Sequence, residues 1–110
     1  MSVEIESLYE RGARSLTEAR FDDALESLAE AHRMDPENAR VQSLLGVATA
    51  RSGGSFEAAR SLCEEATERE FDNAELYVNL ARIYLGYGLR GEALCYLRRG
   101  QMIESDHPAV

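Results

Sequence analysis

The sequence predicts an all-α fold in which about six helices form three helix-turn-helix hairpins. The first reason is an internal repeat, because Ala24 and Ala59 are 35 residues apart and Ala59 and Ala93 are 34 residues apart. The second reason is spacing, because apolar residues recur every three or four positions, as over residues 76–87. A repeat of this length is typical of stacked helical hairpins.

The six helices are expected at residues 3–17, 20–34, 37–52, 55–70, 73–87 and 90–103. Asp35 and Pro36 predict the start of the third helix, with Asp35 as N-cap and the proline in the first helical position. Asp72, followed three residues later by Glu75, has the pattern of a capping box at the start of the fifth helix.

Small residues recur where the two helices of each hairpin are expected to cross, so that their backbones approach closely. Glycine-containing turns at 52–55 and 86–88 separate the helices of the second and third hairpins, and the extra residue of the longer step is expected at 51–55. We expect one domain over residues 1–110, with repeats at about 5–38, 39–73 and 74–106. The small residues are Gly12, Ala24, Gly46, Ala59, Ala81 and Ala93.

The composition narrows the classes of partner. Of 110 residues, 20 are acidic and 12 basic, a net charge of −8 that disfavours nucleic acid and anionic membranes. There is no apolar run of about 18 residues for a membrane span, and the N-terminus does not resemble a signal peptide. Cys63 and Cys95 are expected as small buried hydrophobes in a reduced compartment. These features predict a cytoplasmic protein.

No catalytic residue, cofactor site or metal site is expected. Every Lys or Arg position is arginine, so a phosphate-binding loop with its lysine is absent. His32, near a predicted helix end, suits the helix dipole, and His107 has no spaced metal-ligand partner. The carboxylate pairs at 22–23 and 64–65 are typical of solvated helix faces.

From residue 5 to about 106, the chain resembles the tetratricopeptide repeat (TPR) family. The matching segments are Phe21-Asp-Asp-Ala24 with Asp35-Pro36, and Asn79-Leu80-Ala81 with Tyr84, Glu92-Ala93-Leu94 and Leu97. The early aromatic slot holds Leu8, Gln42 and Tyr77 instead of tryptophan, and Phe71 and Ser105 replace the closing proline. The resemblance implies a right-handed superhelix whose first helices line a concave groove that binds a peptide.

Carried over by position, the resemblance places candidate groove residues on the three first helices. Leu44 and Val47 would form an apolar patch flanked by Arg40, Arg51 and Arg82, suited to a peptide with an apolar anchor and an acidic group. Ordinary packing of Leu44 and Val47 fits the spacing nearly as well. The candidates are Tyr9, Ala13, Arg40, Leu44, Val47, Arg51, Asn79 and Arg82.

The resemblance also allows one function of the family to be checked against this sequence, the binding of the acidic C-termini of heat-shock chaperones. The family members that do so use a set of lysine, arginine and asparagine side chains in the groove. Here only Asn79 could serve, and Glu75 would repel the ligand carboxylate. That role is not expected. The matching positions are Tyr9, Ala13, Leu44, Glu75 and Asn79.

The end of the sequence leaves alternatives open. Ser105-Asp106-His107-Pro108 looks like another helix start. We therefore expect that the sequence is a fragment cut before a capping helix. The alternatives are a naturally short chain and a last face that another copy covers. Self-association through the C-terminal face, giving a homo-oligomer, would use Tyr96, Met102 and Ile103. Residues 4–37 carry a net charge of −6 and residues 73–110 balance, which fits either head-to-tail contact between copies or a polar end that keeps the array soluble. The third alternative is an accessory domain of a larger protein.

Overall fold

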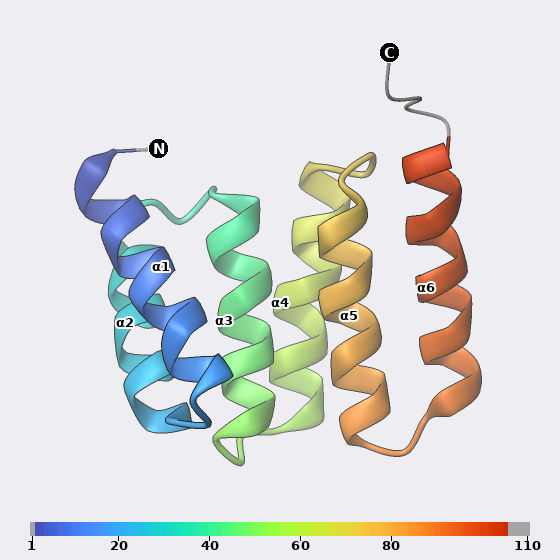
Figure 1. Ribbon diagram of the computed structural model, residues 1–110, viewed down its shortest axis with the longest axis horizontal. Helices are drawn as coiled ribbons and strands as arrows, with labels where there is room; N and C mark the ends of the chain where they lie inside the picture. Colours follow the sequence, from blue (N-terminus) through green and yellow to red (C-terminus); the bar gives the residue numbers. More distant parts are fainter. Residues whose placement is uncertain (1, 106–110) are drawn as a thin grey trace.

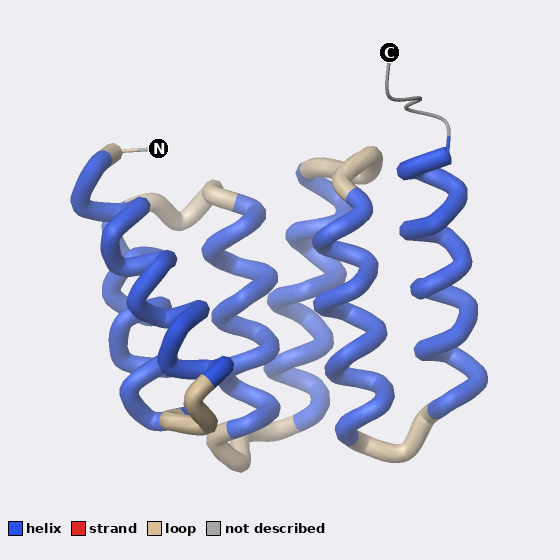
Figure 2. The backbone as a smooth tube through the Cα atoms, viewed as in Figure 1, coloured by secondary structure: helices blue, strands red, loops and turns tan. Residues whose placement is uncertain are grey.

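The computed structural model describes residues 2–105, and within that range the chain forms six helices and no strand (Figures 1 and 2). Successive helices pair as three antiparallel hairpins, which confirms the predicted all-α fold. The helices are α1 Val3–Thr17, α2 Phe21–Met34, α3 Ala39–Arg51, α4 Phe56–Arg69, α5 Ala74–Gly86 and α6 Arg90–Ser105.

The hairpins stack in chain order along the longest axis of the molecule, with α1 and α6 at opposite ends of the stack (Figure 1). The second helix of each hairpin packs on the first helix of the next, α2 on α3 and α4 on α5. The middle first helix, α3, also contacts both α1 and α5. Side chains of α3 are therefore covered from several directions.

The small residues lie where the helices of a hairpin touch, as predicted. Ala24, Ala59 and Ala93 are fully buried. A Cβ added to Gly12 would lie 2.5 Å from Cγ of Leu28, so the leucine side chain occupies the space that the glycine leaves. The repeat of small residues in the sequence therefore reports the close approach of paired helices.

Two predicted helix starts are wrong. Asp35 ends α2, with its backbone N–H bonded to a carbonyl of that helix, and α3 begins at Ala39. The N-cap of α3 is Asn38, whose side chain accepts from the backbone N–H of Val41 at 3.1 Å, while Pro36 lies in the turn. Both Asp35 and Asn38 are good capping residues, and only the path of the turn selects between them.

The N-cap of the fifth helix lies one residue later than predicted. Asn73 caps α5, and its side-chain oxygen accepts from the backbone N–H of Glu75 at 3.1 Å. The carboxylate of Glu75 bonds to Tyr9, on a different hairpin. The expected capping box with Asp72 is therefore not formed.

Each hairpin turn contains one residue with a left-handed backbone. These residues are Ala19, Gly53 and Gly88, with φ of 58°, 91° and 76°. The second turn, residues 52–55, is one residue longer than the turns at 18–20 and 87–89. The extra residue of the longer repeat step was expected in this second turn. The sequence does not signal the first turn, because it uses alanine where the others use glycine.

The two cysteines differ, which corrects the expectation that both are buried. Cys63 faces α3 and donates its S–H to the carbonyl of Ser43 at 3.1 Å, and burial raises the pKa of its thiol to about 12. Cys95 is exposed because α6 packs only on α5 among the helices described. Both thiols are free.

None of the helices in the described part of the chain is long and apolar enough to cross a membrane. His32 lies in the last turn of α2, as expected. Ser105 is the last residue of α6, so it does not begin a further helix. The remainder of that predicted start, residues 106–108 with His107, lies outside the described residues.

Candidate peptide-binding groove

The predicted groove residues lie on the first helices of the three hairpins, α1, α3 and α5 (Figure 1). Burial divides them into three groups. Tyr9, Leu44, Val47 and Asn79 are buried, whereas Arg40 and Arg51 are exposed. Ala13 and Arg82 are half-buried. The three arginines also differ in their polar contacts.

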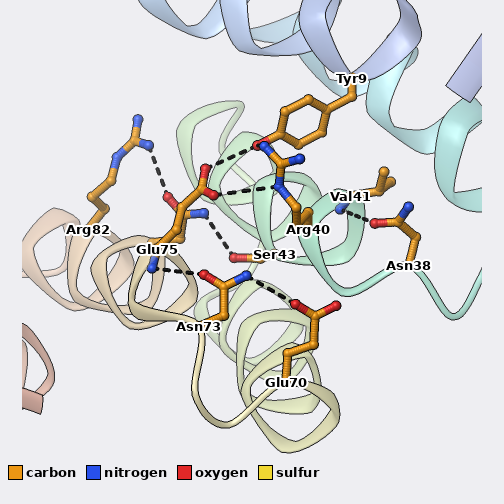
Figure 3. A network of polar contacts seen from close by, with 10 residues as sticks. Tyr9, Asn38, Arg40, Val41, Ser43, Glu70, Asn73, Glu75 and Arg82 are labelled. Carbon is orange, nitrogen blue, oxygen red and sulfur yellow. Dashed lines mark hydrogen bonds and ion pairs between the residues drawn. The ribbon is translucent and has the colours of Figure 1, made fainter. Parts of the chain in front are cut away.

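At the end of the groove where α3 and α5 begin, three side chains from three hairpins meet (Figure 3). The hydroxyl of Tyr9 donates to Oε1 of Glu75 at 3.2 Å, and Nε of Arg40 lies 3.5 Å from Oε2 of Glu75. Arg40 also donates to the hydroxyl of Tyr9 at 3.4 Å and stacks over its ring at 4.7 Å. Burial, and then the charge of Glu75, raise the pKa of the Tyr9 hydroxyl. Arg40 is therefore already paired.

In the middle of the groove, Asn79 links α5 to α3. Its side-chain N–H donates to Oγ of Ser43 at 3.0 Å, and its carbonyl oxygen accepts from Nη1 of Arg82 at 3.2 Å. Because Asn79 is buried and both ends of its amide are bonded, it positions Arg82 and offers little surface to a ligand.

Where α3 and α5 end, the structure contains a pocket of about 730 Å³. Arg51 and Arg82 both line it, and neither forms an ion pair with a carboxylate of residues 2–105. Burial, and then the charge of Arg51, lower the pKa of Arg82. The guanidinium of Arg51 lies 6.0 Å from the ring of Phe21. Two cationic groups thus share one pocket without a described anionic partner.

Leu44 and Val47 do not form an accessible apolar patch, and their burial agrees with the alternative of ordinary packing. These side chains are only 5% and 1% exposed, because α3 is covered by both neighbouring hairpins. Val47 contributes to the floor of the pocket and Leu44 does not line it. The remaining apolar lining is Phe21, Ala50, Ile83, Leu85 and Tyr87.

Two residues of this lining, Phe21 and Tyr87, fall outside the predicted groove for a definite reason. Phe21 begins a second helix and Tyr87 lies in a turn, so neither belongs to the first helices that define the groove by position. Their place in or next to a hairpin turn is the signal that could have found them, since turns at the same end of stacked hairpins lie together. Among the described residues, no cluster of His, Cys, Asp and Glu suits a metal ion.

No protein-family model and no curated protein matches the sequence. Solved structures do match it over nearly its whole length. The structure of the TPR2B domain of yeast Sti1 in complex with pHsp70 superposes with a TM-score of 0.77 at 23% identity, covering 96% of this chain and 83% of that one. The first TPR of Spaghetti (RPAP3), bound to HSP90 peptide SRMEEVD, gives 0.75 at 20% identity, covering 96% and 82%.

A MamA structure from MSR-1 gives a TM-score of 0.71 at 21% identity and covers 94% of this chain. The chain spans 59% of that MamA structure, which is less than two thirds of its length. At these identities the similarity establishes the fold. The six helices have the superhelical hairpin fold of TPR domains, in agreement with the resemblance found in the sequence.

Proposed function

We propose that this chain is a non-catalytic protein-interaction scaffold that binds a peptide segment of a partner protein in the groove formed by α1, α3 and α5. The observation that carries the proposal is the pocket at the end of α3 and α5, where Arg51 and Arg82 lie beside apolar walls without a described carboxylate partner. The peptide places an acidic group between these two arginines and an apolar side chain against the wall.

An anion is the expected ligand because two neighbouring cations destabilise each other. The charge of Arg51 contributes to lowering the pKa of Arg82, so a carboxylate between them would relieve an existing repulsion. Guanidinium groups bind carboxylates through paired N–H donors, which gives orientation as well as affinity. The bond from Arg82 to Asn79 holds one of these groups in place before the ligand arrives.

The two ends of the groove favour different parts of a peptide. At the start of α3 and α5, Glu75 is partly exposed and its partner Arg40 is already occupied, so an acidic ligand group is disfavoured there. At the end of the same helices, Arg51 and Arg82 attract one. The charges therefore orient the peptide along α3 and α5.

The peptide complexes of the TPR domains from Sti1 and Spaghetti support the use of this fold for peptide binding. The ligand of this chain differs from a chaperone tail, because the positions of the chaperone-binding side chains hold Ala13, Leu44 and Glu75 instead. The free thiols of Cys63 and Cys95 are consistent with the cytoplasmic location that we expect.

The test starts with selection of random short peptides with free C-termini on the wild-type protein. A selected peptide, labelled with fluorescein, is then titrated by fluorescence polarisation against wild type and the R51Q and R82Q variants. Acidic residues should be enriched in the selection, and each variant should weaken binding about tenfold, the effect of losing one charge-assisted hydrogen bond.

The control is R14Q, which removes an exposed arginine of α1 that does not line the pocket. It should bind the peptide as wild type does. Urea unfolding of R82Q separates a lost contact from a lost fold, since Arg82 is half-buried. Selection without acidic enrichment, or equal binding by R51Q, R82Q and wild type, would overturn the proposal.

A further inference from the structure

The last hairpin leaves one apolar face uncovered. Among the described helices α6 packs only on α5, at the end of the stack (Figure 1, red). Val78 and Leu94 are 40% and 47% exposed there, and with the half-buried Leu97 they line a hollow of about 310 Å³. Apolar side chains grouped in this way are typical of an interaction surface.

The repeat identifies the kind of partner that fits the hollow. On the preceding hairpin, the equivalent face of α3 and α4 is the one on which helix α5 packs. The shift of 34 or 35 residues replaces Ser43 and Arg60 by apolar residues and the small Cys63 by a leucine, so the uncovered face is the more hydrophobic of the two. A helix is therefore the expected occupant. The equivalent pairs are Ser43 and Val78, Arg60 and Leu94, and Cys63 and Leu97.

A single stripe of α6 runs along this face with alternating steps of four and three residues, the spacing of a helix-pairing seam. Its centre is apolar, with Leu94 and Leu97, and its ends carry opposite charges, with Arg90 first and Glu104 last. All the members from Leu94 to Glu104 line the hollow. The stripe is Arg90, Leu94, Leu97, Gln101 and Glu104.

Both end charges are unfavourably placed within their own helix. Arg90 is at the positive N-terminal end of α6 and Glu104 is in the last turn, at the negative end. Neither forms an ion pair with another residue in the described range 2–105. A second helix in the opposite direction would bring the missing counter-charges to both ends.

We infer that α6 pairs with α6 of a second copy of this chain, antiparallel, about a two-fold axis near Leu97. In this arrangement Leu97 packs on Leu97 of the second copy, and Leu94 packs beside its Gln101. Arg90 faces Glu104 of the second copy, and the same contact recurs at the other end. Parallel helices would instead place like charges together. The surface is independent of the groove on α1, α3 and α5.

Head-to-tail contact, with α1 of one copy on α6 of the next, fits the residues poorly. On α5 the side chains that face the preceding hairpin include Leu76, Leu80 and Ile83, all buried. The equivalent positions of α1 are polar and exposed, so α1 cannot fill an apolar hollow. These positions are Ser7, Arg11 and Arg14.

The residues first expected to mediate self-association are only partly suited to it. Tyr96 stacks on Tyr84, with ring centroids 5.3 Å apart, and so packs inward. Met102 is exposed but does not line the hollow, and Ile103 lines a different one, beside Asn73. The interface therefore centres on Leu94 and Leu97.

The experiment measures solution mass by sedimentation equilibrium from about 10 µM to about 1 mM, the range in which a small helical interface associates. The wild-type mass should rise from 12.2 kDa towards twice that value. L94E should stay at the monomer mass over the same range.

Charge reversal tests the antiparallel register. R90E and E104R should each weaken association about tenfold or more, because both end contacts become repulsive. An equal mixture of R90E and E104R should associate again, because each mixed dimer has opposite charges at both ends. Each substitution also suits the helix dipole of α6, so neither should unfold the protein.

The matched control is R11E, a charge reversal on the exposed face of α1, which should associate as wild type does. A wild-type mass fixed at 12.2 kDa throughout would overturn the inference. So would a mixture of R90E and E104R that fails to associate, or association abolished by R11E. Peptide binding by the groove is measured separately, so the two proposals fail independently.

Discussion

Gly46 shows how closely the two helices of a hairpin approach each other. A Cβ added there would lie 2.7 Å from Sγ of Cys63 and 2.9 Å from the backbone carbonyl oxygen of Ala59. A side chain can rotate away, but a backbone carbonyl within α4 cannot move without shifting the helix. This position therefore sets the spacing between α3 and α4.

The G46A substitution should lower the free energy of unfolding by about 2 kcal/mol, because the added methyl group overpacks the contact between α3 and α4. The matched control is G91A, since a Cβ at Gly91 in α6 would meet no atom within 4 Å. That variant should gain about 0.5 kcal/mol from higher helix propensity. Urea denaturation measures both, and equal effects would contradict the packing explanation.

At the scale of the helices, the start of α3 is decided by a single side chain. Asn38 accepts from the N–H of Val41, and its amide nitrogen lies 3.5 Å from Oδ2 of Asp35. Asp35 therefore supports the turn from outside the helix while Asn38 caps it. The two residues have similar capping propensity, so their positions in the fold separate their roles.

The N38A substitution should lower the free energy of unfolding by about 1 kcal/mol, because a backbone donor of α3 loses its acceptor. D35A serves as the comparison and should cost less than half as much. Thermal unfolding followed by circular dichroism measures both variants. A larger loss in D35A than in N38A would show that the sequence-based assignment of the cap was right.

At the scale of the whole molecule, one contact joins the first hairpin to the third. Tyr9 and Glu75 are 66 positions apart in the sequence, and Arg40 of the middle hairpin bonds to both. The ion pair is partly exposed, so its contribution to stability is small. Its larger effect is on function, because it occupies Arg40 at one end of the groove.

The E75Q substitution should therefore change ligand preference more than stability. We expect the free energy of unfolding to fall by less than about 1 kcal/mol, because an exposed ion pair is lost while the glutamine still accepts from Tyr9. Binding of the selected acidic peptide should strengthen severalfold, because Arg40 is released and a repelling carboxylate is removed. The R40Q/E75Q double variant is the control and should lose the part of that gain that comes from Arg40 in the polarisation assay.

The helices and their pairing could be predicted from the sequence, because both depend on neighbours along the chain. Apolar residues at helical spacing define each helix, and small residues such as Gly12 and Ala24 mark where two consecutive helices touch. The longer second turn was also predictable from the step between repeats. Helix starts were less certain, because Asp35 and Asn38 both satisfy the local rules.

The state of the groove was decided by the tertiary structure. Arg40, Arg51 and Arg82 looked alike in the sequence, yet Arg40 meets Glu75 while the other two line a pocket. For Leu44 the sequence left a groove patch and ordinary packing open, and the residue is buried because α3 lies between two hairpins. Which charges are paired depends on side chains from different hairpins, whose distances no spacing along one helix encodes.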